Sequence, residues 1–206
     1  MDHALHALAY SERGKRILSQ LDEQTGRNNT FIHLWILLAA ALCIGIYLIA
    51  TTVLIAGDGV LYIQYARQMG INPIETMKAH YQHPGYPWLI YAVHQTVGLL
   101  FGKDVSIQSW IYCGQATALV FRLSALAVLY FISRHLFGRV LSLWAIVILI
   151  VLPKPAEYGS DVLSDWPHLF FLSAALLLLL KGTSRKNWLF GLAGLCAGAG
   201  YLIRPE

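Results

Sequence analysis

Long apolar runs separated by short polar segments dominate this chain. The first run, residues 31–56, is almost wholly apolar. As a helix it would extend roughly 39 Å, enough to cross a bilayer with some tilt. Further apolar runs occupy residues 110–131, 140–152, 166–180 and 188–203. The pattern predicts an all-α, polytopic integral membrane bundle of about five transmembrane helices.

A long polar stretch, residues 57–109, separates the first two spans and contains one short apolar run, Trp88–Gly102. His94, Gln95 and Thr96 lie in the middle of that run, and lipid would make these polar groups costly. The pattern favours a juxtamembrane or re-entrant helix, with a complete span as the alternative. We therefore interpret residues 57–109 as an outer loop that carries juxtamembrane helices.

The last three apolar runs are shorter than an isolated span requires, so they must recruit flanking residues or shield one another in a hairpin bundle. Gly194 and Gly198 in the last run form a small-xxx-small pair, which typically lets two helices approach closely. We expect this pair to pack against a neighbouring helix.

The composition agrees with a membrane protein. Hydrophobic residues make up 57% and charged residues 13% of the 206 positions, with a mean hydropathy of +0.55, whereas about a quarter of a soluble domain is charged. The three cysteines, Cys43, Cys113 and Cys196, lie in or beside apolar runs without metal-ligand spacing. The sequence has no basic patch interleaved with aromatic residues of the kind that nucleic-acid-binding proteins use, so we expect no nucleic-acid partner. The expected surroundings are membrane lipids.

The basic residues predict an orientation. If segment 88–102 does not cross, then tail 1–30, turn 134–139 and loop 181–186 share one side and hold nine of the 15 Lys and Arg residues. Short loops rich in Lys and Arg typically face the cytoplasm. We expect a cytoplasmic tail, either a surface amphipathic helix or a solvated segment, followed by a domain (31–206) in the plasma (inner) membrane.

Asp58 lies between Gly57 and Gly59 just after the first span. A carboxylate at this position either belongs to a simple turn or acts as a general base toward a hydroxyl, which requires an acceptor of this type within hydrogen-bond reach. The flanking glycines would permit unusual backbone angles and close approach of a substrate.

The string His83-Pro84-Gly85-Tyr86-Pro87-Trp88 is the most specific local pattern. Proline favours a helix start, and the free N–H groups of such a start favour an anion such as phosphate. His83 could add a donor or a positive charge. The alternative is a structural turn with an interfacial tryptophan.

Arg122 is an energetic anomaly on an apolar helix, where it costs several kcal/mol unless it snorkels, pairs or faces a wet cavity. We favour a cavity-facing role toward an anionic headgroup over snorkelling.

Asp161 and Asp165 precede another span. Either one caps the next helix, or it provides a second outward carboxylate that orients an acceptor or a cation. A metal site from Asp58, His80, His83, Asp161 and Asp165 is conceivable, but their spacing does not support one, so we expect neither a metal nor another cofactor.

Taken in order, these residues resemble the N-terminal part of the GT-C membrane glycosyltransferases, the superfamily of the protein O-mannosyltransferases and aminoarabinose transferases. The resemblance runs from about residue 31 to the end. It comprises Asp58 with Tyr62, Tyr65-Ala66 and Met69; His83-Pro84-Gly85-Tyr86 with Trp88; Arg122; Ser133-Arg134-His135-Leu136-Phe137-Gly138-Arg139; Asp161 and Asp165; and Gly191 to Tyr201-Leu202-Ile203-Arg204-Pro205-Glu206.

The resemblance implies transfer of a sugar, with inversion, from a polyprenyl-phosphate-linked donor to a lipid, glycan or protein acceptor on the outer face. Asp58 would act as base, His83 and Arg122 would meet the donor phosphate, and Asp161 or Asp165 would supply a second catalytic carboxylate. We also expect Tyr62, His80 and Tyr86 to contribute to substrate binding.

Two features depart from the superfamily pattern. Gly85 stands where these enzymes usually have a second proline, and the enzymes are much longer, whereas this chain ends where a sixth span would begin. A non-catalytic remnant or subunit that binds lipid or a partner is therefore an alternative. A transporter is a third possibility, although we find neither the internal repeats nor the paired interrupted helices typical of that class.

Overall fold

The computed structural model describes residues 31–80, 82–102, 106–182 and 187–205. The predicted cytoplasmic tail and most of the basic loop 181–186 lie outside the described residues. All regular elements within the described ranges are helices, which confirms the all-α class. The chain divides into two units, Met1–Leu37 and Leu38–Glu206, and the helix Phe31–Thr51 contains the boundary between them.

Two of the described helices are long and apolar enough to cross a membrane. They are Phe31–Thr51, with 21 residues, and α5 (Ile107–Phe137), with 31 residues. Two shorter apolar helices, α6 (Arg139–Val151) and α9 (Trp188–Ile203), match predicted spans in position, as does α8 (Asp165–Lys181). Membrane-crossing helices are therefore supported, while a bundle of five spans stays a prediction.

The predicted outer loop is largely helical. It forms α2 (Gly57–Met69), α3 (Pro73–Ala79) and α4 (Gly85–Phe101). Pro73 occupies the first turn of α3, where its missing N–H costs nothing. His94 on α4 is buried and its ring stacks on Trp110 of α5, 3.7 Å between centroids. His94 therefore packs against protein, whereas Thr96 is exposed and donates its hydroxyl to the Ala92 carbonyl oxygen.

Helix ends follow from local sequence. Ser106 caps α5, and its hydroxyl accepts a hydrogen bond from the Ser109 N–H at 3.2 Å. Gly138 separates α5 from α6 at φ 79°, a conformation that favours glycine. The short helix α7 (Pro153–Tyr158) again begins with proline.

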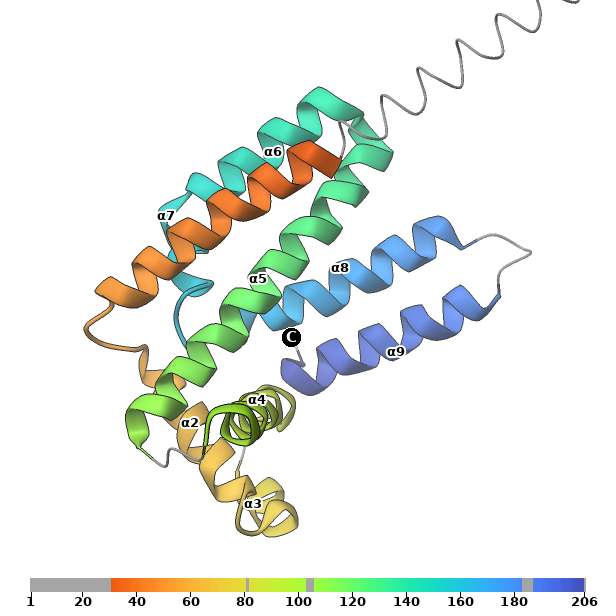
Figure 1. The fold of residues 1–206 in the computed structure, drawn as a ribbon. Coiled ribbons are helices and arrows are strands. Elements are labelled where there is room, and N and C mark those ends of the chain that lie inside the picture. Colours follow the sequence, from red (N-terminus) through yellow and green to blue (C-terminus); the bar gives the residue numbers. More distant parts are fainter. Residues whose placement is uncertain (1–30, 81, 103–105, 183–186, 206) are drawn as a thin grey trace, which may run out of the picture. The chain divides into compact units, whose positions relative to one another are not determined.

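The helices of the second unit pack against one another in pairs (Figure 1). α8 lies beside α9 and packs against α5, α5 also contacts α6, and α4 contacts α2, α5 and α9. A core of buried residues joins the ends of these helices: Ile63, Ala66, Tyr86, Ile90, Trp110, Val162 and Ile203. Side chains at those helix ends are thus held by a packed core.

The prediction for Gly194 and Gly198 is wrong within the described part of the chain. Apart from the backbone of α9 itself and the adjoining residues, no described atom lies within 4 Å of where a Cβ would stand at either residue. The α8–α9 contact instead passes Gly200, whose added Cβ would meet Phe171 and Leu172 at 3.5 Å.

Candidate functional site

A cleft of about 360 Å³ collects polar side chains from several helix ends. Asp58 and Tyr62 come from α2, His83 from the turn before α4, Asp165 from the start of α8 and Arg204 from the end of α9. The remaining lining residues are Leu61, Gln82, Leu163, Ser164, Ile203 and Pro205. The structure therefore brings together four of the eight residues that the sequence singled out.

Asp58 is an exposed carboxylate in the first turn of α2. An acid there is stabilised by the positive end of the helix. Within the described residues its carboxylate has no hydrogen-bond or ion-pair partner. A Cβ at Gly59 would stand 2.9 Å from the Val162 carbonyl oxygen, so glycine at this position lets the backbone around Val162 approach α2 closely. The space beside Gly57 is open.

Asp161 anchors the start of α2 instead of lining the cleft. Its Oδ2 accepts a hydrogen bond from the Ala56 N–H at 2.9 Å, and its Oδ1 accepts one from the Val162 N–H at 2.7 Å. Ala56 is the N-cap residue of α2, so the carboxylate also faces the positive end of that helix. Asp161 thus caps α2, which precedes it by about a hundred residues, and not the following helix α8.

Asp165 is paired with Arg204, a residue that sequence reasoning did not single out. The Arg204 Nη1 donates to the Asp165 Oδ1 at 2.7 Å, and both side chains are about one third exposed. Solvent therefore screens much of this attraction. The sequence placed Arg204 in the closing string of the resemblance, after the last apolar run, but assigned it no role.

His83 also lines the cleft and lies edge-on to Tyr201 of α9, with 5.7 Å between ring centroids. The next helix begins at Gly85, whose added Cβ would stand 2.6 Å from the Leu202 carbonyl oxygen. The start of α4 therefore lies directly on the end of α9. This contact gives a physical reason for glycine at the position where the superfamily usually has proline.

Tyr62 and Tyr86 differ in their access to the cleft. The Tyr62 hydroxyl lies 3.2 Å from the Ser164 hydroxyl at the cleft wall. Tyr86 is fully buried, packs edge-on against Tyr62 and donates to the Gly114 carbonyl oxygen at 3.4 Å. Burial first, and then electrostatic interactions with Tyr62, Asp161 and Asp165, raise the pKa of Tyr86 well above its ordinary value. Tyr86 therefore supports the cleft as a neutral phenol.

His80 lies outside the cleft lining. Its ring stacks on Tyr65 with 4.2 Å between centroids, and its Nε2 lies 2.7 Å from the Gln68 Oε1. Burial raises the pKa of Tyr65. These contacts join the end of α3 to α2.

Arg122 does not line the cleft either, because its side chain is completely buried. Its Nη2 donates to the Ile150 carbonyl oxygen at 3.3 Å, in the last turn of α6. Its guanidinium carbon lies 5.9 Å from the Trp166 ring centroid, and a methyl group at Gly159 would overlap its side chain. A cation at a helix C-terminus and beside an aromatic ring is stabilised by both. These contacts favour a structural role.

No group of three or more His, Cys, Asp or Glu side chains in the described ranges is arranged to hold a metal ion. The cleft instead offers an unpaired carboxylate, an imidazole and a partly neutralised guanidinium. Such a set can accept a proton and hold an anion.

Comparison with known proteins supplies the family. No curated protein and no solved structure matches the chain significantly. The family described as dolichyl-phosphate-mannose-protein mannosyltransferase matches residues 82–206, more than half of the chain. The matched part includes His83, Asp165 and Arg204, whereas Asp58 and Tyr62 precede it. The family consists of membrane-integral, mannosyltransferase-type glycosyltransferases. This chain belongs to the dolichyl-phosphate-mannose-protein mannosyltransferase family.

Proposed function

We propose that this protein transfers a sugar from a polyprenyl-phosphate-linked donor to a hydroxyl group of a lipid, glycan or protein acceptor. The reaction takes place in the cleft between α2, α4, α8 and α9. The observation that carries the proposal is the unpaired state of Asp58. Asp165, the other carboxylate of the cleft lining, is engaged by Arg204, and Asp161 is engaged by backbone N–H groups.

Asp58 is the general base of the proposed reaction. Its carboxylate takes the proton of the acceptor hydroxyl while the acceptor oxygen forms a bond to the anomeric carbon. The bond from that carbon to the phosphate oxygen breaks, and the phosphate leaves with the electron pair. Because the oxygen enters opposite the leaving group, a single displacement inverts the anomeric centre.

His83 and Arg204 are the proposed phosphate contacts. Charge develops on the departing phosphate, and fixed donors aimed at it lower the barrier. His83 also stands directly before α4, whose N-terminus carries a partial positive charge. Asp165 holds Arg204 in place through the 2.7 Å contact and reduces its net charge, which permits release of the product.

The cleft faces the side of the membrane opposite the N-terminal tail in this proposal. The basic residues that predict the orientation place the tail in the cytoplasm and residues 57–109 outside the plasma (inner) membrane. The donor would then be used on the outer face, where lipid-linked sugars can serve without a nucleotide.

The test is donor turnover by the full chain in proteoliposomes supplied with polyprenyl-phosphate mannose and a hydroxyl acceptor. We expect Asp58→Asn to lower turnover by about a hundredfold or more, the usual contribution of a general base, while donor binding is retained. Glu75→Gln is the matched control, because this exposed acid on α3 contacts Asn72 outside the cleft. Unchanged turnover in Asp58→Asn, or wild-type protein that binds donor without turnover, contradicts the proposal.

A further inference from the structure

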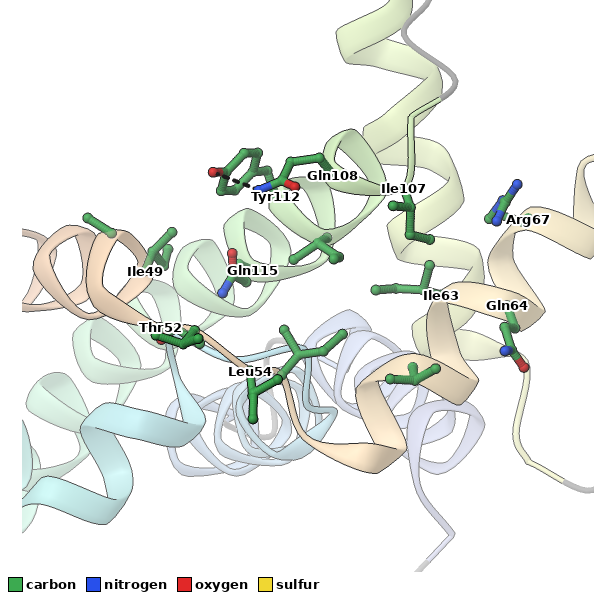
Figure 2. Close-up of a pocket in the computed structure, with 15 residues that line it drawn as sticks. Ile49, Thr52, Leu54, Ile63, Gln64, Arg67, Ile107, Gln108, Tyr112 and Gln115 are labelled. Carbon is green, nitrogen blue, oxygen red and sulfur yellow. Dashed lines mark hydrogen bonds between the residues drawn. The ribbon is translucent and has the colours of Figure 1, made fainter.

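The face of α2 opposite the cleft borders a second, larger hollow of about 410 Å³ (Figure 2). Three segments line it. They are the end of the helix Phe31–Thr51 with the residues that follow it up to Ile55, α2, and the first turns of α5. Figure 2 shows Leu54 and Ile63 pointing into the space, with Gln115 on the α5 side and Arg67 at the far end of α2. Most of the lining is aliphatic.

This hollow continues along α2. A neighbouring hollow of about 410 Å³ shares Gln64 and Arg67 with it and reaches Ile71 and Trp110. The two hollows therefore form one groove along α2 from Val60 to Gln68, about 12 Å at 1.5 Å per residue, and it continues to Ile71 just beyond the helix. We call this the α2 groove. It starts beside the last turn of the candidate span Phe31–Thr51.

Two polar groups in the groove have no partner among the described residues. The Gln115 side chain is 2% exposed, and its Oε1 accepts no hydrogen bond. A buried polar atom left in that state costs about 1–3 kcal/mol, so a ligand with a matching polar group would be favoured. Arg67 is exposed and forms no ion pair, and no acidic residue lines either hollow.

We propose that the α2 groove binds an anionic membrane lipid. The lipid chain lies along Val53, Leu54 and Ile111, where aliphatic walls exclude water. The Gln115 Oε1 accepts a hydrogen bond from a hydroxyl group of the headgroup, and Arg67 holds the headgroup anion. A lipid in this position stays bound at the edge of the bilayer, on the face of α2 that carries no acid.

The charge of the groove favours an anionic lipid over a zwitterionic one. A choline or ethanolamine headgroup gains from an acidic partner, and the lining offers none. Guanidinium and phosphate form charge-assisted, often bidentate hydrogen bonds. The inference does not depend on the catalytic proposal, since the groove and the cleft share no lining residue.

The test uses the full chain in nanodiscs with trace photo-crosslinkable phosphatidylglycerol or phosphatidylcholine, and maps the labelled peptides by mass spectrometry. We expect phosphatidylglycerol to label residues 49–55 and 107–115. Arg67→Gln should lower this labelling by about tenfold, the loss of one charge-assisted hydrogen bond, and Arg67→Lys should restore most of it. Gln115→Leu should lower it several-fold.

Lys78→Gln is the matched control, because it removes an exposed cation from α3 outside the groove. Its labelling should equal that of the wild type. Equal labelling by phosphatidylcholine, unchanged labelling in Arg67→Gln, or labels confined to other segments would overturn the inference.

Discussion

The two faces of α2 meet different surroundings, although they belong to the same 13-residue helix. On one face Asp58 and Tyr62 border a cleft whose walls are polar pairs, Asp165 with Arg204 and Tyr62 with Ser164. On the other face Ile63 and Arg67 border a groove with aliphatic walls and one buried amide. Asp58 and Arg67 have no ion-pair partner within the described ranges; Asp58 faces the polar cleft and Arg67 faces the apolar groove. The difference suits the first face to a sugar phosphate and the second to a lipid.

The largest expected effect comes from removing the support that both faces share. Asp161→Ala removes the hydrogen bond to the Ala56 N–H at the start of α2 and the one to the neighbouring Val162 N–H, and we expect it to lower the free energy of unfolding by about 2 kcal/mol. Both turnover and lipid labelling should fall, because α2 positions both faces. Thermal unfolding in detergent measures the stability. Glu157→Gln, which breaks only the exposed pair with Lys154, should leave it within about 0.5 kcal/mol.

Gly85→Ala should damage the cleft and spare the groove. The added Cβ would stand 2.6 Å from a backbone oxygen of α9, so we expect a loss of about 1–3 kcal/mol from overpacking. Turnover should fall with it, since His83 and Arg204 lie at this contact. Gly194→Ala is the control, because the space there is open and alanine favours a helix. Equal stability of the two variants would contradict the proposed α4–α9 contact.

Arg204→Gln should act on donor binding in the cleft. Loss of a charge-assisted contact to phosphate should raise the KM for the donor about tenfold, with a smaller change in kcat. Steady-state turnover at varied donor concentration separates the two constants. Lys154→Gln, an exposed cation outside the cleft, should match the wild type, and an unchanged KM in Arg204→Gln would exclude the assigned contact.

The smallest effect is expected from Tyr86→Phe, which removes one long hydrogen bond and should cost under about 1 kcal/mol at neutral pH. The folded state raises the pKa of Tyr86. The stability that the neutral phenol contributes is therefore fully present below the unfolded pKa of about 10 and is lost as pH rises through the folded pKa. Above pH of about 10, the wild type should therefore lose stability faster than Tyr86→Phe. Parallel unfolding curves across that range would contradict the buried, neutral phenol.

Hydrophobic patterning predicted the helices well because burial in lipid or protein sets their period and length. The last helix begins and ends at the predicted residues 188 and 203, and α6 and α8 differ from the prediction by one residue at each end. The helix Phe31–Thr51 begins at the predicted residue but ends five residues before the predicted residue 56. Thr51 and Thr52 donate their hydroxyl groups to the carbonyl oxygens of Tyr47 and Leu48 where the helix ends.

The gathering of Asp58, Tyr62, His83 and Asp165 was expected once these residues were assigned to one side of the membrane. Arg204 and the role of Asp161 were not, because both depend on contacts between residues 39 and 105 positions apart. Arg122 shows the same limit. Its sequence context marks an isolated cation, but only the fold shows that α6 ends beside it. The α2 groove left no sequence pattern, because segments far apart in the chain line it.

The most direct test of the account is a double-mutant cycle with Asp58→Asn and Arg67→Gln in the full chain, reading donor turnover and phosphatidylglycerol labelling on the same samples. We predict that Asp58→Asn lowers turnover about a hundredfold and leaves labelling unchanged. Arg67→Gln should lower labelling about tenfold and leave turnover unchanged, and the double variant should show both losses independently. If Arg67→Gln abolishes turnover as Asp58→Asn does, or if either variant abolishes both readouts, the two faces of α2 serve one site and the account is wrong.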